Sequence, residues 1–342
     1  MRILLATDAW QPQVNGVVRT IERLVADAAT LGADIYVLGP DRFYTVPLPT
    51  YSEIRLAMTL PGTVARLVEE SGADYIHIAT EGPIGMMVRR YCMRTNRPFT
   101  TSYHTRFPEY VAARIPVPVE LTYGWLRRFH NAGRAIMVTT DSLAEELRQR
   151  GFDNPVRWPR GVDSDLFRPQ PSILDLPKPI FMYVGRVAVE KNLDAFLSLD
   201  LPGSKVIVGD GPQRIELSQK FPDAHFLGTK LGEDLAAHYA SADVFVFPSR
   251  TDTLGLVVLE ALAAGVPIAA YPVTGPKDII GSARVGVLSE DLREASLKAL
   301  DISPDLCREH ALKFSWLECA RIFLENVRTF QDASSPADRS AA

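Results

Sequence analysis

Short apolar runs alternate with amphipathic stretches through the first half of the chain. The apolar runs are rich in β-branched residues and end at polar residues or glycine, which is typical of buried strands. They cover 2–7, 34–38, 75–79, 99–102 and 135–139. Stretches with helical spacing separate them, at 16–31, 61–71, 85–95, 105–131 and 142–150, the fourth interrupted by prolines. This alternation predicts a parallel, doubly wound sheet.

The same alternation starts again after a proline-rich linker. The linker carries Pro169, Pro171, Pro177 and Pro179. The strand-like runs that follow are 179–184, 205–208, 225–227, 243–248 and 268–271. The helical stretches between them are 192–199, 212–220, 232–241 and 256–264, and later segments are mostly helical, ending at 315–330. We therefore expect an α/β protein with two Rossmann-like domains that face a cleft, at 1–168 and 169–312, and a disordered tail at 331–342.

The stretch 249–260 is the strongest candidate for a ligand site. It leads from the apolar run 243–248 through a polar loop into a helix entered at Gly255. Free N–H groups at a helix start favour an anion, and glycine lets the anion approach the backbone. Asp252 and Glu260 flank this point, and Glu260 lies roughly 7–8 Å along the helix from Gly255. Since carboxylates bind hydroxyls rather than phosphates, the pattern suits a nucleotide sugar, although an ordinary βα unit with an acidic loop explains it too.

Other candidate residues follow predicted strands, where doubly wound sheets bind their ligands. Gly16 opens the first helix, without the glycine pattern of a dinucleotide site or the lysine of a P-loop. His104 follows the run 99–102 and suits a sugar hydroxyl or a proton transfer, or a structural role. Arg186 and Lys191 follow the run 179–184 and suit a diphosphate, or form a solvated basic loop.

Composition narrows the class of protein. The chain of 342 residues has 46% hydrophobic and 23% charged residues, as soluble globular proteins do. Its net charge of −4 argues against a nucleic-acid binder. Three cysteines without metal-ligand spacing suggest structural thiols in a reducing compartment, and the first apolar run is too short for a signal peptide, so we expect a cytoplasmic protein. Asp163 and Asp165 match an Asp-x-Asp metal signature only superficially.

Positive charge gathers in one part of the chain. Residues 86–134 hold nine arginines against two acids, Glu109 and Glu120. Arg127 and Arg128 stand beside Trp125 and other apolar residues, a combination that suits an anionic membrane surface. A solvated helix face with core aromatics is the alternative. The first explanation predicts peripheral attachment to the inner face of the cell membrane and a lipid acceptor such as diacylglycerol.

Taken in order, these segments resemble the large family of retaining GT-B glycosyltransferases that includes bacterial lipid mannosyl-, glucosyl- and sulfoquinovosyltransferases. The resemblance runs over nearly the whole chain. It is carried by Gly16-Val17-Val18, Tyr103-His104-Thr105, Arg160-Gly161-Val162-Asp163, Gly185-Arg186, Glu190-Lys191-Asn192, Gly209-Asp210-Gly211-Pro212, Asp252 with Glu260, and Phe314-Ser315-Trp316.

The resemblance implies a first domain that binds the acceptor, a second that binds the nucleotide sugar, and a terminal helix at 313–330 that packs back on the first. Arg186 and Lys191 would bind the diphosphate, helped by backbone N–H groups near Thr253, Leu254 and Gly255. The remaining implied contacts are Glu260 to the ribose, Asp252 and His104 to the donor sugar, Gly16 to the phosphates or sugar, and Leu227 to the base.

The family usually has Glu where this chain has Asp252, which puts the identity of the donor sugar in doubt. The resemblance implies transfer of a hexosyl group from a UDP- or GDP-sugar with retention of configuration, and neither a cofactor nor a metal. A saccharide acceptor is the alternative within this chemistry. From other classes, a nucleotide-sugar epimerase or a sugar-binding protein remains possible on the sequence.

Overall fold

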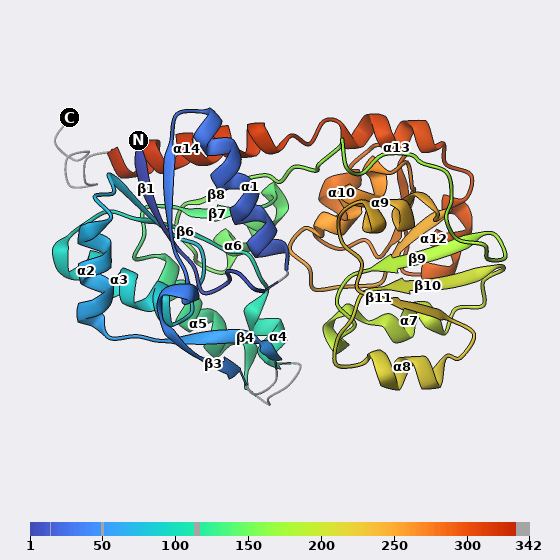
Figure 1. Cartoon of the computed structure of the whole chain (residues 1–342), viewed down its shortest axis with the longest axis horizontal. Helices are drawn as coiled ribbons and strands as arrows, with labels where there is room; N and C mark the ends of the chain where they lie inside the picture. Colours follow the sequence, from blue (N-terminus) through green and yellow to red (C-terminus); the bar gives the residue numbers. More distant parts are fainter. Residues whose placement is uncertain (14, 49–50, 113–116, 333–342) are drawn as a thin grey trace. The chain divides into compact units, whose positions relative to one another are not determined.

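The computed structural model describes residues 1–13, 15–48, 51–112 and 117–332. The chain divides into two compact units. The first unit joins Met1–Pro159 to Trp316–Ala342, and the second is Arg160–Ser315. Each unit has its own sheet, and each is described by itself (Figure 1).

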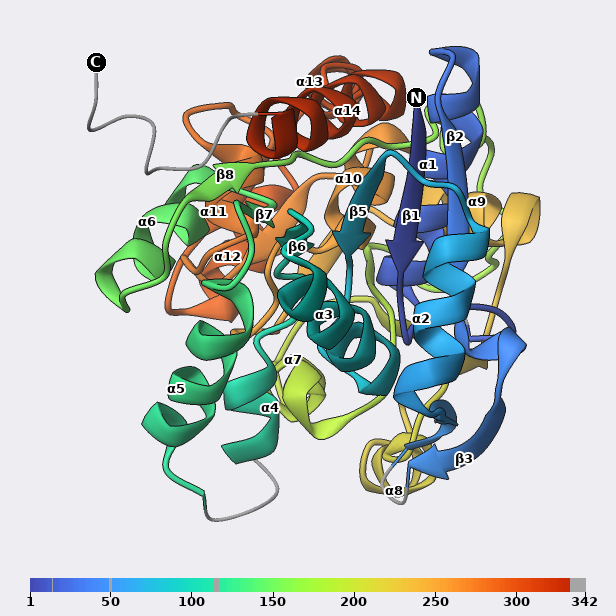
Figure 2. The ribbon, with the colours of Figure 1, turned by 90° about the vertical axis from the view of Figure 1, so that its left-hand side faces the viewer.

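The sheet of the first unit is parallel throughout, with the strand order β2-β1-β5-β6-β7-β8. Its strands are β1 (Arg2–Ala6), β2 (Asp34–Leu38), β5 (Tyr75–Ile78), β6 (Thr100–Ser102), β7 (Ile136–Val138) and β8 (Pro155–Arg157). Figure 2 shows β1 and β5 side by side and pointing the same way. Because β2 lies on one side of β1 and β5 on the other, the winding of the sheet reverses between β1 and β5.

Helices connect the strands of this sheet. They are α1 (Gly16–Thr30), α2 (Pro61–Glu70), α3 (Pro83–Thr95), α4 (Phe107–Ala112), α5 (Val119–His130) and α6 (Asp141–Gln149). Side chains that follow strands accept hydrogen bonds from the first N–H groups of three of these helices. Asp8 caps α3, Asn15 caps α1, and Thr140 accepts from the amide of Leu143 in α6. Helix starts are thus fixed to the carboxyl edge of the sheet.

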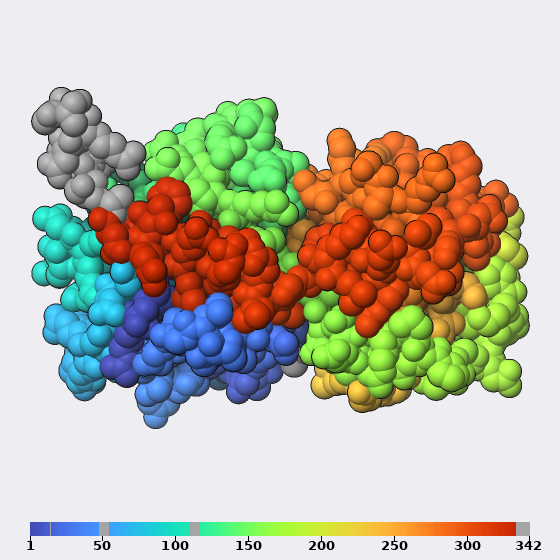
Figure 3. Space-filling view, turned by 90° about the horizontal axis from the view of Figure 1, so that it is seen from above, coloured from blue at the N-terminus to red at the C-terminus, as the bar shows by residue number. Residues whose placement is uncertain are grey.

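The terminal helix α14 (Trp316–Asp332) belongs to the first unit, although the second unit precedes it in the chain. It lies along α1, as the red and blue segments of Figure 3 show. The indole of Trp158 donates to the Cys319 carbonyl at 3.2 Å, and Phe323 packs against His77. Gln331 bonds both backbone groups of Ile76, so this part of the predicted disordered tail is ordered helix. The rest of that tail, 333–342, lies outside the described residues.

An antiparallel hairpin of β3 (Tyr44–Leu48) and β4 (Tyr51–Met58) stands apart from the main sheet of the first unit and was not predicted. A short 3₁₀ helix, η1 (Pro40–Arg42), precedes it. Tyr44 lies opposite Met58 in the register, and both side chains are exposed. The strands were missed because their apolar residues do not form a buried run.

The second unit also has a parallel sheet, with the order β11-β10-β9-β12-β13-β14. Its strands are β9 (Ile180–Val184), β10 (Ser204–Val208), β11 (His225–Gly228), β12 (Val244–Phe247), β13 (Ile268–Ala270) and β14 (Gly286–Leu288). The prediction of two doubly wound parallel sheets is confirmed. The edge strand β14 was missed, because it is short and only partly buried.

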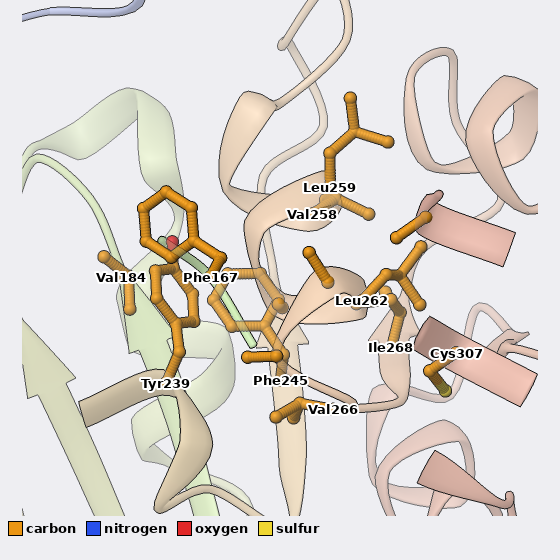
Figure 4. Packing of buried hydrophobic residues seen from close by; sticks show 14 of the residues in the cluster. Phe167, Val184, Tyr239, Phe245, Val258, Leu259, Leu262, Val266, Ile268 and Cys307 are labelled. Atoms are coloured by element: carbon orange, nitrogen blue, oxygen red, sulfur yellow. The ribbon is translucent and has the colours of Figure 1, made fainter. Parts of the chain in front are cut away.

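The helices of the second unit pack on both faces of this sheet. They are η2 (Val189–Lys191), α7 (Leu193–Leu197), α8 (Arg214–Lys220), α9 (Gly232–Ala240), α10 (Leu256–Ala263), α11 (Pro276–Ile280), α12 (Leu292–Ala299) and α13 (Pro304–Ala311). Figure 4 shows α10 residues in the core with Phe167. Arg308 donates to the carbonyls of Ser164 and Phe167 at 2.8 and 2.6 Å. These contacts hold Ser164 and Phe167 in the second unit, which begins at Arg160, whereas the sequence predicted the boundary at 168.

Candidate functional site

The winding of the second sheet reverses between β9 and β12, which are hydrogen-bonded neighbours. Open α/β sheets bind ligands outside the carboxyl ends of their strands at such a point. The two loops that leave the sheet here are 185–192, after β9, and 248–255, after β12. The predicted donor residues Arg186, Lys191, Asp252 and Gly255 all lie in these loops.

An ion pair joins the two loops. The ammonium of Lys191 lies 2.5 Å from Oδ1 of Asp252, and the two side chains are 17% and 16% exposed. Asn192, in the left-handed region at φ 55°, donates its amide to the Pro248 carbonyl at 3.2 Å. The structure thus brings together a lysine predicted to bind the diphosphate and a carboxylate predicted to bind the sugar.

The second oxygen of Asp252 is buried, and no described residue bonds to it. A buried polar atom without a partner costs about 1–3 kcal/mol, so native proteins seldom leave one unless a ligand or water satisfies it. The oxygen lies in the loop after β12, at the switch point. It is therefore the atom of this site that most needs an external hydrogen-bond donor.

Glycines allow the neighbouring loops to pack backbone against backbone. A Cβ added to Gly209 would meet the Gly185 carbonyl oxygen at 2.0 Å, and one added to Gly211 would meet that of Val187 at 2.4 Å. The amide of Val187 donates to the Asp210 carbonyl at 2.9 Å, and Tyr183 donates to the carbonyl of Arg186 at 3.0 Å. These contacts fix the backbone that carries Arg186, whose side chain is half-buried.

Helix α10 begins at the switch point without a side-chain cap. Gly255, its N-cap, has φ 86°, and a Cβ there would lie 3.0 Å from the ring of Phe247. Leu254 points into the core, so only its backbone can face a ligand. Thr253 is half-buried beside it. The start of α10 therefore has no side-chain cap on its backbone N–H groups, and anion binding there stays a prediction.

Glu260 lies inside α10 and is buried. The hydroxyl of Tyr239, from α9, donates to its Oε2 at 2.7 Å. Tyr239 packs edge-on against Phe167 and beside Phe245, as Figure 4 shows. The tyrosine therefore fixes the orientation of the carboxylate. The sequence did not single out Tyr239, because nothing in a local pattern shows that α9 and α10 pack together.

Leu227 lies in β11, half-buried near the carboxyl end of this strand. The Gly228 carbonyl accepts a hydrogen bond from the amide of Gly209 at 2.8 Å, which ties β11 to the loop after β10. The residue predicted to contact the base is thus on the same sheet edge as Arg186, two strands away from β9 in the order.

Two predicted site residues, Gly16 and His104, belong to the first unit. Gly16 is the first residue of α1, but the Asn15 side chain accepts from the amides of Val17 and Val18 at 3.0 Å each, so these two N–H groups already have a partner. His104 follows β6 and is half-buried. Its ring packs edge-on against that of Trp158, with the ring centroids 5.7 Å apart.

Arg106, two residues after His104, holds Glu146 of α6 with two hydrogen bonds of 2.8 and 2.6 Å. Burial raises the pKa of Glu146, but the paired guanidinium outweighs it and lowers the pKa below its ordinary value. Glu146 also lies 3.4 Å from Arg150, whose guanidinium covers the Tyr123 ring. The loop that carries His104 is therefore anchored to α5 and α6.

The predicted membrane residues lie on α5. Trp125 is 41% exposed and Leu121 67% exposed, and Phe107 of α4 lies 6.4 Å from Trp125 between ring centroids. Arg128 is exposed, whereas Arg127 donates to the Arg150 carbonyl at 3.0 Å and so also serves the fold. No helix within the described ranges has both the length and the apolar composition needed to cross a bilayer.

Other predicted arginines of the basic stretch are used inside the first unit. Arg89 donates to the carbonyls of Phe129 and Arg128 at 3.0 and 2.9 Å, which ties α3 to the end of α5. Arg97 donates to the Ala73 carbonyl. Only part of the local positive charge is therefore free of internal hydrogen bonds and faces solvent.

The Asp-x-Asp segment lies in the second unit, where Asp163 accepts from the amide of Leu166 at 3.1 Å. Within the described part of the chain, no three His, Cys, Asp or Glu residues gather as a metal site. Cys92, Cys307 and Cys319 are buried, and none of them forms a disulfide in the described structure.

Comparison with known proteins adds the following. Residues 178–301 match the family described as "Glycosyl transferases group 1", and residues 14–166 match "Glycosyltransferase Family 4". A GDP-mannose-dependent alpha-mannosyltransferase of Mycobacterium tuberculosis is 30% identical over 315 residues, which cover 84% of this chain and 83% of that protein. An alpha-monoglucosyldiacylglycerol synthase of Streptococcus pneumoniae is 25% identical, over 91% of this chain and 81% of that protein.

Solved structures with the same fold include a sucrose-phosphate synthase of Thermosynechococcus elongatus, with a TM-score of 0.76, 21% identity and coverage of 97% of this chain and 100% of that one. HepE of Anabaena in complex with UDP-glucose has a TM-score of 0.72, 14% identity and coverage of 96% and 100%. At these identities the likeness concerns the fold alone, which is the GT-B fold.

Proposed function

Because the chain belongs to the family of group 1 glycosyltransferases, we propose that it transfers a hexosyl group from a nucleoside-diphosphate sugar to a membrane lipid acceptor. The observation that carries the proposal is the Lys191–Asp252 pair at the switch point of the second sheet. The other carboxylate oxygen of Asp252 is buried and can accept a hydrogen bond from the ligand. A sugar hydroxyl is such a donor group.

The donor binds by groups of the second unit. The diphosphate lies at the uncapped start of α10, where the helix dipole and the N–H groups favour an anion, and Arg186 and Lys191 add positive charge. Glu260, oriented by Tyr239, accepts from the ribose hydroxyls. Asp252 accepts from a hydroxyl of the sugar.

The nucleotide is UDP or GDP. Three relatives, from two mycobacteria and a Corynebacterium, are described as GDP-mannose-dependent alpha-mannosyltransferases, so GDP-mannose is the first donor to test. Asp252 holds its carboxylate one methylene nearer to the backbone than Glu would. This difference alters which sugar hydroxyl the carboxylate reaches.

The acceptor is a lipid at an anionic membrane surface. Relatives are described as an alpha-monoglucosyldiacylglycerol synthase and a phosphatidylinositol dimannoside mannosyltransferase, both of which act on lipids by their names. On this chain, exposed Trp125 and Leu121 next to Arg128 combine apolar contact with positive charge. The protein would bind peripherally to the inner face of the membrane.

The reaction proceeds with retention of the anomeric configuration and needs no metal. The leaving diphosphate accumulates charge in the transition state, and Arg186, Lys191 and the start of α10 stabilise it. The acceptor hydroxyl attacks from the face that the diphosphate leaves. Activity that survives EDTA and an α-linked product from an α-linked donor, seen by NMR of the anomeric proton, are the expected results.

The deciding experiment mixes the protein with a panel of UDP- and GDP-sugars, with and without anionic lipid vesicles that contain diacylglycerol. Release of nucleoside diphosphate and a new glycolipid, both dependent on the lipid, are expected. A new saccharide with a sugar acceptor in place of lipid would favour the saccharide alternative. Epimerised nucleotide sugar without any acceptor would overturn transfer altogether.

A further inference from the structure

The first sheet has its own switch point, between β1 and β5, and a carboxylate follows each of these strands. Asp8 comes two residues after the end of β1, and Glu81 three residues after the end of β5. Ligands of open α/β sheets lie outside the carboxyl ends of the strands at this point. The two carboxylates are therefore the acidic groups of the first unit best placed to meet a ligand.

Asp8 is fully occupied by the protein. Its Oδ1 accepts from the amide of Ile84 at 2.9 Å, and its Oδ2 from Thr80 at 2.9 Å and from the amide of Gly85 at 3.3 Å. A Cβ on Gly82 would lie 2.4 Å from Cγ of Asp8. Burial raises the pKa of Asp8 despite these bonds. Asp8 thus caps α3 and has no room for a ligand.

Glu81 differs from Asp8 in exposure and in partners. Its side chain is 21% exposed, and its Oε1 lies 3.0 Å from Nε2 of His130, at the end of α5. Among the described residues nothing bonds to Oε2 of Glu81. One carboxylate oxygen is therefore held by the protein while the other has no partner from the described chain.

His130 is buried, and both ring nitrogens have partners. Nδ1 lies 2.8 Å from the hydroxyl of Thr101, whose alternative acceptor, the Ala135 carbonyl, lies 3.5 Å away. A carboxylate oxygen can only accept a hydrogen bond, so the contact between Nε2 and Oε1 of Glu81 places a proton on Nε2. His130 consequently donates its N–H to Glu81, which remains the acceptor.

The surroundings of His130 permit little movement of its ring. The rings of Tyr103, Phe129 and Phe152 surround it, with centroids 5.1 to 6.0 Å from that of the imidazole. Arg89 fixes the end of α5 by binding the carbonyls of Phe129 and Arg128. The histidine is therefore a rigid donor that sets the direction of the Glu81 carboxylate.

We propose that Glu81 binds the hydroxyl of the acceptor that receives the sugar, and that His130 is its positioning residue. The proposal rests on the proposed function, since it names a binding group for the acceptor of that reaction. The acceptor hydroxyl donates a hydrogen bond to Oε2 of Glu81. A carboxylate that accepts this hydrogen bond also makes the oxygen more nucleophilic.

The test measures acceptor and donor kinetics separately in wild type, Glu81→Gln, His130→Leu and the double variant. Glutamine keeps the shape and loses the charge, so kcat/KM for the acceptor should fall about 10- to 100-fold while the donor dissociation constant stays unchanged. His130→Leu should lower the same quantity, and the double variant should lose no more than Glu81→Gln alone, because both act through one carboxylate. His130→Gln, which offers an amide N–H in place of Nε2–H, should recover part of the loss.

The control is Glu69→Gln, which alters an exposed carboxylate of α2 in the same unit and should change neither constant. A wild-type protein that makes no glycolipid overturns both the proposed function and the inference. A wild type that makes glycolipid, with Glu81→Gln equal to it in acceptor kinetics, overturns the inference alone. Losses from Glu81→Gln and His130→Leu that add in the double variant overturn the role of His130.

Discussion

The ammonium of Lys191 and the carboxylate of Asp252 lie 2.5 Å apart. In the sequence, the strands β10 and β11 and the helices between them separate the two residues. The contact exists because β9 and β12 are neighbours in the sheet. It couples the charge that would stabilise the leaving diphosphate to the group that would hold the sugar. Changes at either residue should therefore affect the same kinetic constant.

Asp252→Asn should lower kcat/KM for the donor about 10- to 100-fold, because the neutral amide loses the charge-assisted bond to the ligand. Lys191→Met should produce a loss of similar size, and the double variant should show less than the combined loss. The measurement is a double-mutant cycle on donor kinetics. Asp194→Asn with Lys220→Met, an exposed pair of the same unit, is the matched control and should change little. Strict additivity at Lys191 and Asp252 would disprove the coupling.

Tyr239→Phe should weaken donor binding about 3- to 10-fold, because Glu260 loses the hydrogen bond that orients its carboxylate. Binding of UDP and GDP to the variant, measured by calorimetry, checks the expectation. Tyr44→Phe alters an exposed hydroxyl and serves as control. Unchanged nucleotide affinity in Tyr239→Phe would contradict the proposal that Glu260 binds the ribose.

Trp125→Ser and Arg128→Ser should each reduce binding to anionic vesicles, and the loss from Arg128→Ser should shrink at high salt, because screening already weakens its electrostatic contribution. Sedimentation with vesicles of phosphatidylserine and phosphatidylcholine measures this. Arg127→Ser should also lower thermal stability, since its guanidinium bonds the Arg150 carbonyl. Lys298→Ser, which alters an exposed basic residue of the second unit, is the control. Equal sedimentation of all variants would contradict a membrane role for α5.

The buried thiols should make the fold sensitive to alkali. Burial raises the pKa of Cys92 and of Cys307 to about 12. In the unfolded chain a thiol ionises near pH 8.5, so the contribution of each is complete below that pH and is lost as pH rises toward 12. The free energy of unfolding should fall by about 1.4 kcal/mol per pH unit per thiol above pH 8.5.

Urea titrations between pH 8 and pH 11 measure this decline, and Cys92→Ala should make it less steep. In the native protein at pH 8 none of the three buried cysteines should react quickly with a thiol reagent, whereas all three should react in urea. Rapid labelling of the native chain would contradict the burial.

The family and the two parallel sheets could be predicted because both depend on short local sequence patterns. Buried strands such as β9 read as continuous apolar runs, and the motifs of the family are short segments just after strands. The hairpin β3–β4 escaped prediction because Tyr44 and Met58 face solvent, so no buried run marks its strands. The end of α14 was placed too early because Gln331 looks like a polar tail residue until its amide is seen to bond Ile76.

The site was predicted as a set of residue types and not as a set of contacts. Lys191, Asp252 and Glu260 were each predicted from local sequence, whereas the pairs Lys191–Asp252 and Tyr239–Glu260 depend on which strands and helices become neighbours. Strand order is a property of the whole sheet, and a single sequence carries no local sign of it. The Glu81–His130 pair escaped for the same reason.

The assignment of α14 to the first unit has a consequence for synthesis on the ribosome. The core around Trp158, His77 and Phe323 needs the last helix, which is translated after the whole of Arg160–Ser315. The second unit is continuous in sequence and can complete its core as soon as it has emerged. During synthesis the N-terminal domain usually folds first. Here the first unit cannot complete its core until the chain is nearly finished, so the order is reversed.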